Sequence, residues 1–407
     1  AALSASGAVN MDLLNGITFD TVSSSSTTLS TSQCVTYFGN NDAYRTLLKL
    51  LSKKSTVTRT KALKDMCDIV SACSKNDVVE MMPSFCYYYN EMVYCQSFQV
   101  RLEANRLLEC FNRVLGLDIG KYVKQFIVSL QIYMGDVNAS VQQFCCTLFN
   151  EIIPEARREK VLTKYYDETL TAAHSLLLVD AAFFSQHHEE IDSIDESLDR
   201  LRTTCYTVYV SLLRRRLPLT PVAVELFRSA LQSTVPEVVA SGRPAALALV
   251  MEIANQLPWS DVACDNAQLG KFTKRCRRLL FESAPTNATA EHLSNILALW
   301  MTLAVKYPEI YRDADVARFT QELLGKMKKS DDAQRVLCRN FELVLRVIDS
   351  ALLQPQGHSL VDWALSFYAS VAEAARTPSL TDSLLHVYGC LVRALLKDSE
   401  DASVADA

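Results

Sequence analysis

Glycine is scarce in this sequence, with 11 residues in 407, well below the roughly 7% of an average protein. Segments that alternate strictly between apolar and polar residues, the period-two pattern of half-buried strands, are also few. Leucine and alanine are abundant instead. These deficits argue against β-sheets, so we expect an all-α protein.

Long apolar runs and an N-terminal signal are missing as well. The longest nearly apolar run, residues 296–305, is about half of the roughly 18–20 residues that a membrane span requires. No basic segment followed by an apolar one opens the chain. We therefore expect a cytosolic protein with no membrane partner.

No CxxC pair occurs among the 13 cysteines, which places any zinc ribbon or RING domain outside this chain. The count is odd, the spacing is irregular, and cysteines such as Cys67, Cys110 and Cys145 fall on apolar helical faces. This distribution is typical of buried free thiols in a reducing compartment. We expect no cofactor and no metal in this chain.

Motifs for catalysis are absent too. Residues 116–121 read GLDIGK, but a phosphate-binding loop has four residues between its glycines and a Ser or Thr where this chain has Tyr122. His187 and His188 are adjacent, and neighbouring side chains rarely converge on one metal ion, so an exposed acidic loop is the simpler interpretation. We expect this chain not to be an enzyme by itself.

A repeat is present between residues 42 and 153. Three helix-like segments each carry a small residue, Ala62, Ala104 or Cys145, and these positions differ by 42 and 41 residues. Apolar residues follow each small residue at four and seven positions, on one helical face: Met66 and Ile69, Leu108 and Phe111, Phe149 and Ile152. A period of roughly 40–47 residues built from helix pairs is typical of a HEAT/armadillo-like α-solenoid of stacked antiparallel helix pairs.

The pattern predicts one continuous solenoid with polar ends. We expect a flexible Ser/Thr-rich arm over residues 1–40, HEAT-like repeats over 41–184, an acidic loop over 185–199, a continuing helical solenoid over 200–396, and a polar tail over 397–407. The chain starts without Met and ends without a terminal motif, so we expect it to be part of a longer protein.

Prolines mark two expected helix starts. Pro154 is predicted to open one long helix that reaches about Phe184, and Pro236 to open another that reaches about Leu257, because proline suits the first turn of a helix.

One block of the sequence carries a family resemblance. From Leu47 it reads LLKLLSKKSTVTRTKALKDM. It is similar to the N-terminal region of the listerin family, whose pattern is a leucine-rich helix, then Leu-Ser-Lys-Lys-Asp, then Thr-Lys-x-Lys-Ala. Residues 51–54 match, Ser55 replaces the Asp, Thr58-Arg59 stands for Thr-Lys, and Lys61-Ala62 match. The resemblance covers about residues 42–154 and, more weakly, 201–218.

Listerin is the ubiquitin ligase of ribosome-associated quality control, with its activity in a C-terminal RING domain. The resemblance implies that this chain is a non-catalytic, monomeric docking arm that binds the large ribosomal subunit and its nuclear export mediator factor partner. It places zinc only in the RING domain. The alternative is a generic HEAT-repeat scaffold or transport adaptor that binds protein segments and has no link to ribosomes.

Four basic residues are the candidate partner-binding site: Lys53, Lys54, Arg59 and Lys61. Basic residues at a loop and the following helix can bind ribosomal RNA phosphates, although an ordinary solvated helix face is the alternative. These four coincide with the family pattern, and a solvent-facing loop does not need such a pattern for packing. Other basic patches, such as residues 271–278, have no such support.

Two further features are predicted to be structural. Arg101 opens the second helix of a repeat, where Arg in HEAT-like proteins often pairs with an acidic turn residue and ties neighbouring repeats together. Four tyrosines at helical spacing, Tyr87, Tyr88, Tyr89 and Tyr94, resemble a recognition stripe, but we expect half-buried packing instead.

Overall fold

The computed structural model describes residues 37, 39–186, 193–241 and 243–258, and the isolated positions 295, 299 and 389. The chain divides into two compact units, residues 1–226 and 227–407. Every regular element in the described residues is a helix, which confirms the all-α prediction. None of the described helices is long and apolar enough to cross a membrane.

The described helices follow one another at short intervals. In chain order they are α1 (Asp42–Leu51), α2 (Thr56–Ala72), α3 (Lys75–Glu91), η2 (Met92–Tyr94), α4 (Phe98–Leu115), η3 (Gly116–Lys121), α5 (Val123–Tyr133), α6 (Ala139–Ile152), α7 (Glu155–Lys164), α8 (Tyr166–Leu177), α9 (Ala181–Gln186), α10 (Ile194–Arg214), α11 (Pro221–Ser241) and α12 (Pro244–Gln256).

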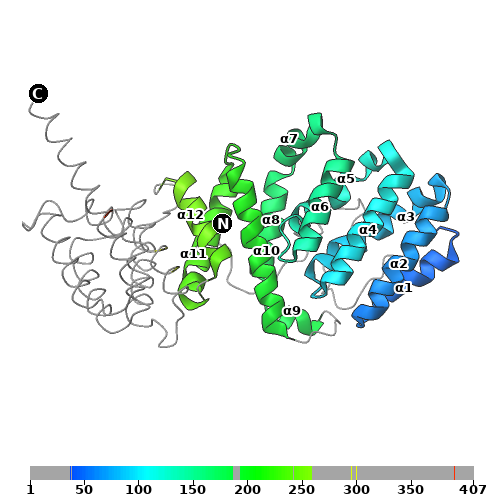
Figure 1. Cartoon of the computed structure of the whole chain (residues 1–407), viewed down its shortest axis with the longest axis horizontal. Coiled ribbons are helices and arrows are strands. Elements are labelled where there is room, and N and C mark those ends of the chain that lie inside the picture. The colour runs from blue at the N-terminus through cyan, green and yellow to red at the C-terminus, as the bar shows by residue number, and fades with distance from the viewer. Residues whose placement is uncertain are drawn as a thin grey trace, which may run out of the picture. The chain divides into compact units, whose positions relative to one another are not determined.

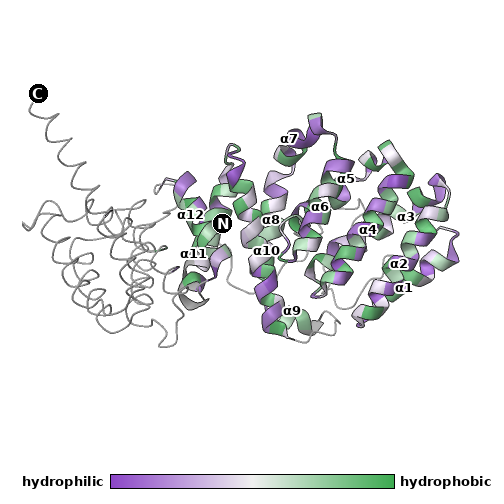
Figure 2. Ribbon diagram, in the orientation of Figure 1, coloured by the Kyte–Doolittle hydropathy of each residue, from purple (hydrophilic) through white to green (hydrophobic). Residues whose placement is uncertain are grey.

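The first unit is a stack of helix pairs in two layers (Figure 1). Helices α1 and α2, α3 and α4, and α5 and α6 pack as pairs, and α8 packs on α10. Along one layer α3, α5 and α8 lie side by side, and along the other α2, α4 and α6 do. Figure 2 shows hydrophobic and hydrophilic residues alternating around each helix, as expected for helices buried on one side. This arrangement is an α-solenoid.

The repeat register is confirmed by burial. Ala62, Ala104 and Cys145 are each 0% exposed, and they belong to α2, α4 and α6, which lie side by side. Small residues at these positions let the helices approach closely. The apolar residues four and seven positions later are also buried, except Ile69, whose place in the core is taken by Val70.

The predicted long helix over residues 154–184 is instead three helices, α7, α8 and α9. Only Leu162 of α7 is buried, whereas α8 has apolar side chains such as Leu170 and Leu176 in the core, where it packs on α5 and α10. The backbone leaves the helical region at Tyr165, with φ −103° and ψ 18°. The break lets α8 follow the stack while the mostly polar α7 stays outside it.

Both ends of the predicted acidic loop over 185–199 are helical, because α9 reaches Gln186 and α10 begins at Ile194. The Ser193 side chain accepts a hydrogen bond from the backbone N–H of Glu196 at 3.2 Å and caps α10. Acidic residues in the first turn, here Asp195 and Glu196, are favoured by the helix dipole. Two of the acidic residues that suggested a loop, Asp195 and Glu196, therefore start a helix.

Pro236 does not open a helix, because α11 continues through it to Ser241. The next helix starts at Pro244, in the first turn, where the missing N–H is tolerated. The predicted arm up to residue 36, the histidines of the acidic segment and most of the later solenoid lie outside the described residues.

Candidate partner-binding site

The turn between α1 and α2 carries two of the predicted site residues, Lys53 and Lys54, and both are exposed. Leu51 is buried and ends α1, the Lys53 N–H donates to the Leu50 carbonyl at 3.1 Å, and Ser55 caps α2 by accepting from the Thr58 N–H at 3.4 Å. Neither lysine pairs with an acidic residue of the described part of the chain. The backbone thus holds two free ammonium groups outward on a short turn.

The other two predicted residues, Arg59 and Lys61, differ in their exposure to solvent. Lys61 is exposed on α2, one turn before Lys64, whose Nζ lies 3.9 Å from Glu103 Oε1 on α4. Arg59 is only 9% exposed, and its Nε is buried. The structure therefore brings Lys53, Lys54 and Lys61 to solvent and places Arg59 inside. Burial favours a structural role for Arg59, and binding by the three lysines stays a prediction.

The repeat explains why Arg59 is buried. It lies three residues before Ala62, just as Arg101 lies three residues before Ala104. Both arginines therefore occupy the same helical position in neighbouring repeats. The three-residue distance from Arg59 to Ala62 can be counted in the sequence. The family pattern groups Arg59 with its basic neighbours, and for that reason Arg59 was predicted to bind a partner.

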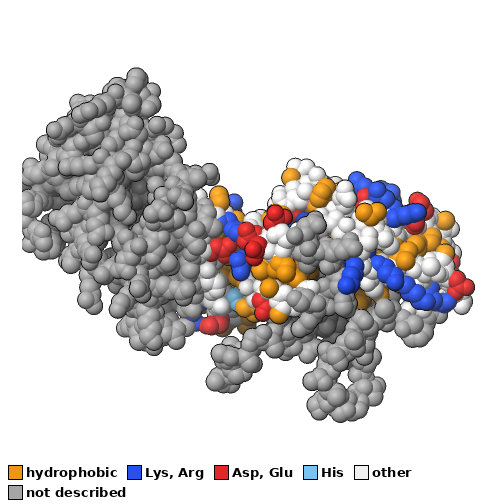
Figure 3. Space-filling view, turned by 90° about the horizontal axis from the view of Figure 1, so that it is seen from below, with side chains coloured by type: hydrophobic (Ala, Val, Ile, Leu, Met, Phe, Trp, Pro, Cys, Tyr) orange, Lys and Arg blue, Asp and Glu red, His pale blue; other side chains and the backbone are white. Residues whose placement is uncertain are grey.

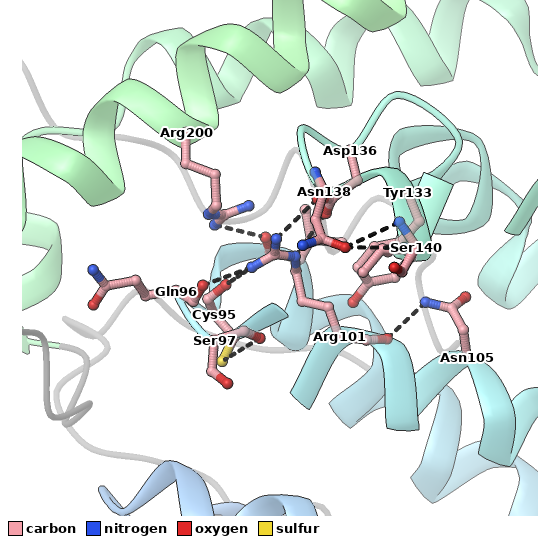
Figure 4. Close-up of polar contacts among 12 residues, drawn as sticks. Cys95, Gln96, Ser97, Arg101, Asn105, Tyr133, Asp136, Asn138, Ser140 and Arg200 are labelled. Atoms are coloured by element: carbon pink, nitrogen blue, oxygen red, sulfur yellow. Dashed lines mark hydrogen bonds and ion pairs between the residues drawn. The ribbon is translucent and has the colours of Figure 1, made fainter. Parts of the chain in front are cut away.

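Arg101 is confirmed as a structural tie between repeats (Figure 4). Its side chain is 1% exposed, and its Nε and Nη2 donate to the two carboxylate oxygens of Asp136 at 2.6 and 2.9 Å. Its Nη1 donates to the carbonyls of Cys95 and Gln96 at 2.7 and 2.8 Å. Asp136 lies in the turn between α5 and α6, and its Oδ1 also accepts the Asn138 N–H at 2.8 Å. The pair joins α4 to the next repeat.

A second buried arginine, which the sequence did not indicate, lies close to this pair. Arg200 of α10 donates from Nη2 to the Val93 carbonyl at 3.0 Å, across 107 residues of sequence. Burial and, after it, the positive charge of Arg101 lower the pKa of Arg200 to about 10, while Asp136 acts in the opposite direction. Asp136 thus pairs with the guanidinium of Arg101, while its charge also favours the charged form of the buried Arg200.

Buried tyrosines add hydrogen bonds next to the Arg101–Asp136 pair and do not form a recognition stripe. Tyr89 is 0% exposed and donates to Asn105 Oδ1 at 2.6 Å, and Asn105 Nδ2 donates to the Arg101 carbonyl at 2.8 Å. Tyr133 donates to the Tyr89 carbonyl at 3.1 Å. Tyr88 and Tyr94 are also buried, and Tyr87 is half-buried. The packing interpretation of these tyrosines is confirmed.

The glycine-bearing segment from residue 116 is a surface turn, η3. Asp118 lies 2.6 Å from Lys75 Nζ and 2.8 Å from Lys121 Nζ. Hydrogen bonds from Lys121 and then Lys75 lower the pKa of Asp118 to about 2. Lys121, which stands where a phosphate-binding loop has its lysine, is therefore paired with Asp118. Within the described residues no three His, Cys, Asp or Glu side chains are grouped to hold a metal ion.

These features define a helical-repeat protein whose neighbouring repeats are joined by a buried Arg–Asp pair and whose first turn exposes free lysines. Comparison with known proteins identifies the family. The family model of "E3 ubiquitin-protein ligase listerin, N-terminal domain" matches residues 40–329, so the chain belongs to the listerin family. No curated protein matches it. A crystal structure of an engineered protein is 12% identical, covers 86% of this chain and 99% of its own, and has a TM-score of 0.28, too low for any argument.

Proposed function

We propose that this chain is a non-catalytic docking arm of a ubiquitin ligase that acts on stalled nascent chains. In this proposal the chain binds the large ribosomal subunit and the nuclear export mediator factor bound to it. The ligase activity and its zinc belong to a RING domain elsewhere in the full-length protein. The free, exposed lysines at the start of the stack carry the proposal, together with membership of the listerin family.

The chemistry of the lysines suits a ribosomal surface. Lys53 and Lys54 lie on a turn held by backbone hydrogen bonds, so few other groups must be ordered when they bind. Figure 3 shows Lys and Arg side chains gathered over one end of the described part, with few acidic groups beside them. Ammonium groups bind ribosomal RNA phosphates by releasing counterions, which makes the affinity fall with salt. A stack of repeats also presents a long surface, as docking between distant points requires.

Co-sedimentation with large ribosomal subunits tests this function. The whole chain is mixed with subunits that carry peptidyl-tRNA, with and without the nuclear export mediator factor, over a range of salt concentrations. We expect selective binding over intact ribosomes. The charge-reversed variant K53E/K54E/K61E should bind roughly tenfold or more weakly and show a shallower dependence of log affinity on log salt.

A matched variant separates local contacts from net charge. Lys124, Lys160 and Lys164 are exposed on α5 and α7, and K124E/K160E/K164E makes the same change in net charge. Equal weakening by both variants would show that only overall charge matters and would contradict a lysine site at the first turn. No binding by the wild-type chain under any condition would overturn the docking function and favour a generic helical scaffold.

A further inference from the structure

Two cysteines of neighbouring repeats lie at the contact between α2 and α4. Cys67 belongs to α2 and Cys110 to α4, and these helices pack side by side in one layer (Figure 1). The buried Ala62 and Ala104 stand 67 − 62 = 5 and 110 − 104 = 6 residues before them. The two thiols therefore occupy matching positions, one to two helical turns beyond the buried small residues. Both are free thiols in the structure.

Cys110 has two hydrogen-bonding neighbours on α2. They are the Cys67 thiol and the Ser71 hydroxyl, which lie one turn apart on that helix. Lys64 of α2 lies one turn before Cys67, and its Nζ is 3.9 Å from Glu103 Oε1 on α4. The α2–α4 contact therefore continues on both sides of the cysteines and holds their side chains together. A disulfide requires such a placement, because its two Cα atoms must lie within about 7 Å of one another.

The two thiols differ in acidity. Hydrogen bonding with Cys67, and after it with Ser71, lowers the pKa of the Cys110 thiol to about 7 against the opposing effect of burial. The positive charge of Arg113 acts in the same direction. Hydrogen bonding with Cys110 raises the pKa of Cys67, which is half-buried and keeps the pair in reach of solvent. Since the thiolate is the reactive form, Cys110 is the nucleophile of the pair and Cys67 its neighbouring thiol.

We infer that Cys67 and Cys110 form a redox site at which hydrogen peroxide produces a reversible disulfide between neighbouring repeats. The Cys110 thiolate attacks one peroxide oxygen, the O–O bond breaks, and the released hydroxide takes up a proton to become water. Cys67 Sγ then attacks the Cys110 sulfenic acid. The S–S bond forms, the S–O bond breaks, and the hydroxyl group leaves as a second water with the proton of Cys67. Two thiols thus lose two electrons, and the peroxide is reduced to two waters.

The disulfide ties α2 directly to α4 and closes a loop that contains α3. Such a cross-link stabilises the folded chain by restricting the unfolded one. A dithiol reductant reverses it by thiol–disulfide exchange, as is typical of the transient disulfides of reducing compartments. The site goes beyond the proposed docking function and does not depend on it.

Peptide mapping without reduction tests the site. The whole 407-residue chain is treated with hydrogen peroxide, its remaining thiols are blocked with iodoacetamide in denaturant, and its tryptic peptides are analysed by mass spectrometry. Cys110 falls in the peptide of residues 107–113, and Cys67 in that of residues 65–75, which also contains Cys73. We expect these two peptides as one linked species that dithiothreitol separates, and fragmentation should place the bond on Cys67.

Two matched variants distinguish the neighbours in the same peptide. Cys67→Ala should abolish the linked species and leave Cys110 as a sulfenic acid that dimedone traps. Cys73→Ala should leave the linked species unchanged. Circular dichroism verifies the fold of both variants, and the wild-type chain oxidised in urea shows how much linkage arises without the fold.

Three results would overturn the inference. They are the absence of the linked species from the oxidised wild-type chain, a bond from Cys110 to Cys73, and an equal yield of the linked species from the folded chain and the chain unfolded in urea. Failure of the chain to sediment with ribosomal subunits would leave this site standing, because the peptide map does not depend on ribosome binding.

Discussion

We predict that the two partners of the buried Arg101–Asp136 pair contribute unequally to the stability of the first unit. Asp136→Asn keeps the shape of the side chain but removes the negative charge that pairs with Arg101 and favours the charged form of Arg200. Arg101→Met removes one guanidinium, yet leaves Asp136 with the charge of Arg200 and the N–H of Asn138. We therefore expect Asp136→Asn to destabilise the first unit more than Arg101→Met does.

The expected size follows from burial. Both side chains of the Arg101–Asp136 pair are 1% exposed, and removing one partner of such a pair costs about 3–5 kcal/mol, because a buried charge is left uncompensated. With Asp136→Asn the two buried guanidinium groups also repel one another, so we expect the upper part of that range. Arg101→Met should lie at or below its lower end. The double variant should cost less than the two single changes added together.

Hydrogen exchange is the suitable measurement, since all three tryptophans, Trp259, Trp300 and Trp363, belong to the second unit and do not report on the first. Amides of α4 and of the turn between α5 and α6 should lose protection in urea. The exposed pair Arg113–Glu109 supplies the control, because Arg113→Ala should change protection little and only at low salt. A smaller effect of Asp136→Asn than of Arg101→Met would refute the reasoning.

Two further predictions concern the α2–α4 contact. Ala62→Leu or Ala104→Leu should overpack this contact and cost about 1–3 kcal/mol in urea unfolding followed by hydrogen exchange, and an unchanged stability of both would contradict the repeat register. Cys67, and after it Ser71 and the positive charge of Arg113, lower the pKa of the Cys110 thiol below its usual value. Cys110 should therefore be alkylated by iodoacetamide at lower pH than other thiols of the unit, and Cys67→Ala should move its pH profile upward; an unmoved profile in mass spectrometry would contradict that contact.

Local patterns in the sequence were enough for the elements and their repeat. Helical periodicity and small residues at a period near 42 predicted α2, α4 and α6 and the burial of Ala62 and Ala104, because these depend on residues within a few turns of one another. Boundaries that depend on packing were less well predicted. The helix over residues 154–184 was taken as continuous, although its two ends pack differently.

The candidate site was only partly predictable for the same reason. Lys53 and Lys54 are exposed because they lie in a short turn, which the sequence shows. Arg59 and Lys61 both belong to α2 and differ in the side of the helix on which they lie, and the stack decides which side is buried. The family pattern, read as one basic cluster, could not make that distinction.

The sequence by itself determined the helices, the period of the repeat and the position of Arg101 at the start of a repeat helix, since each follows from neighbours within one or two helical turns. Only the tertiary structure decided which acid pairs with Arg101 and that the buried Arg200 of α10 binds the Val93 carbonyl near that pair. Those contacts join residues 35 to 107 positions apart, and their pairing depends on how the helices stack rather than on any local pattern.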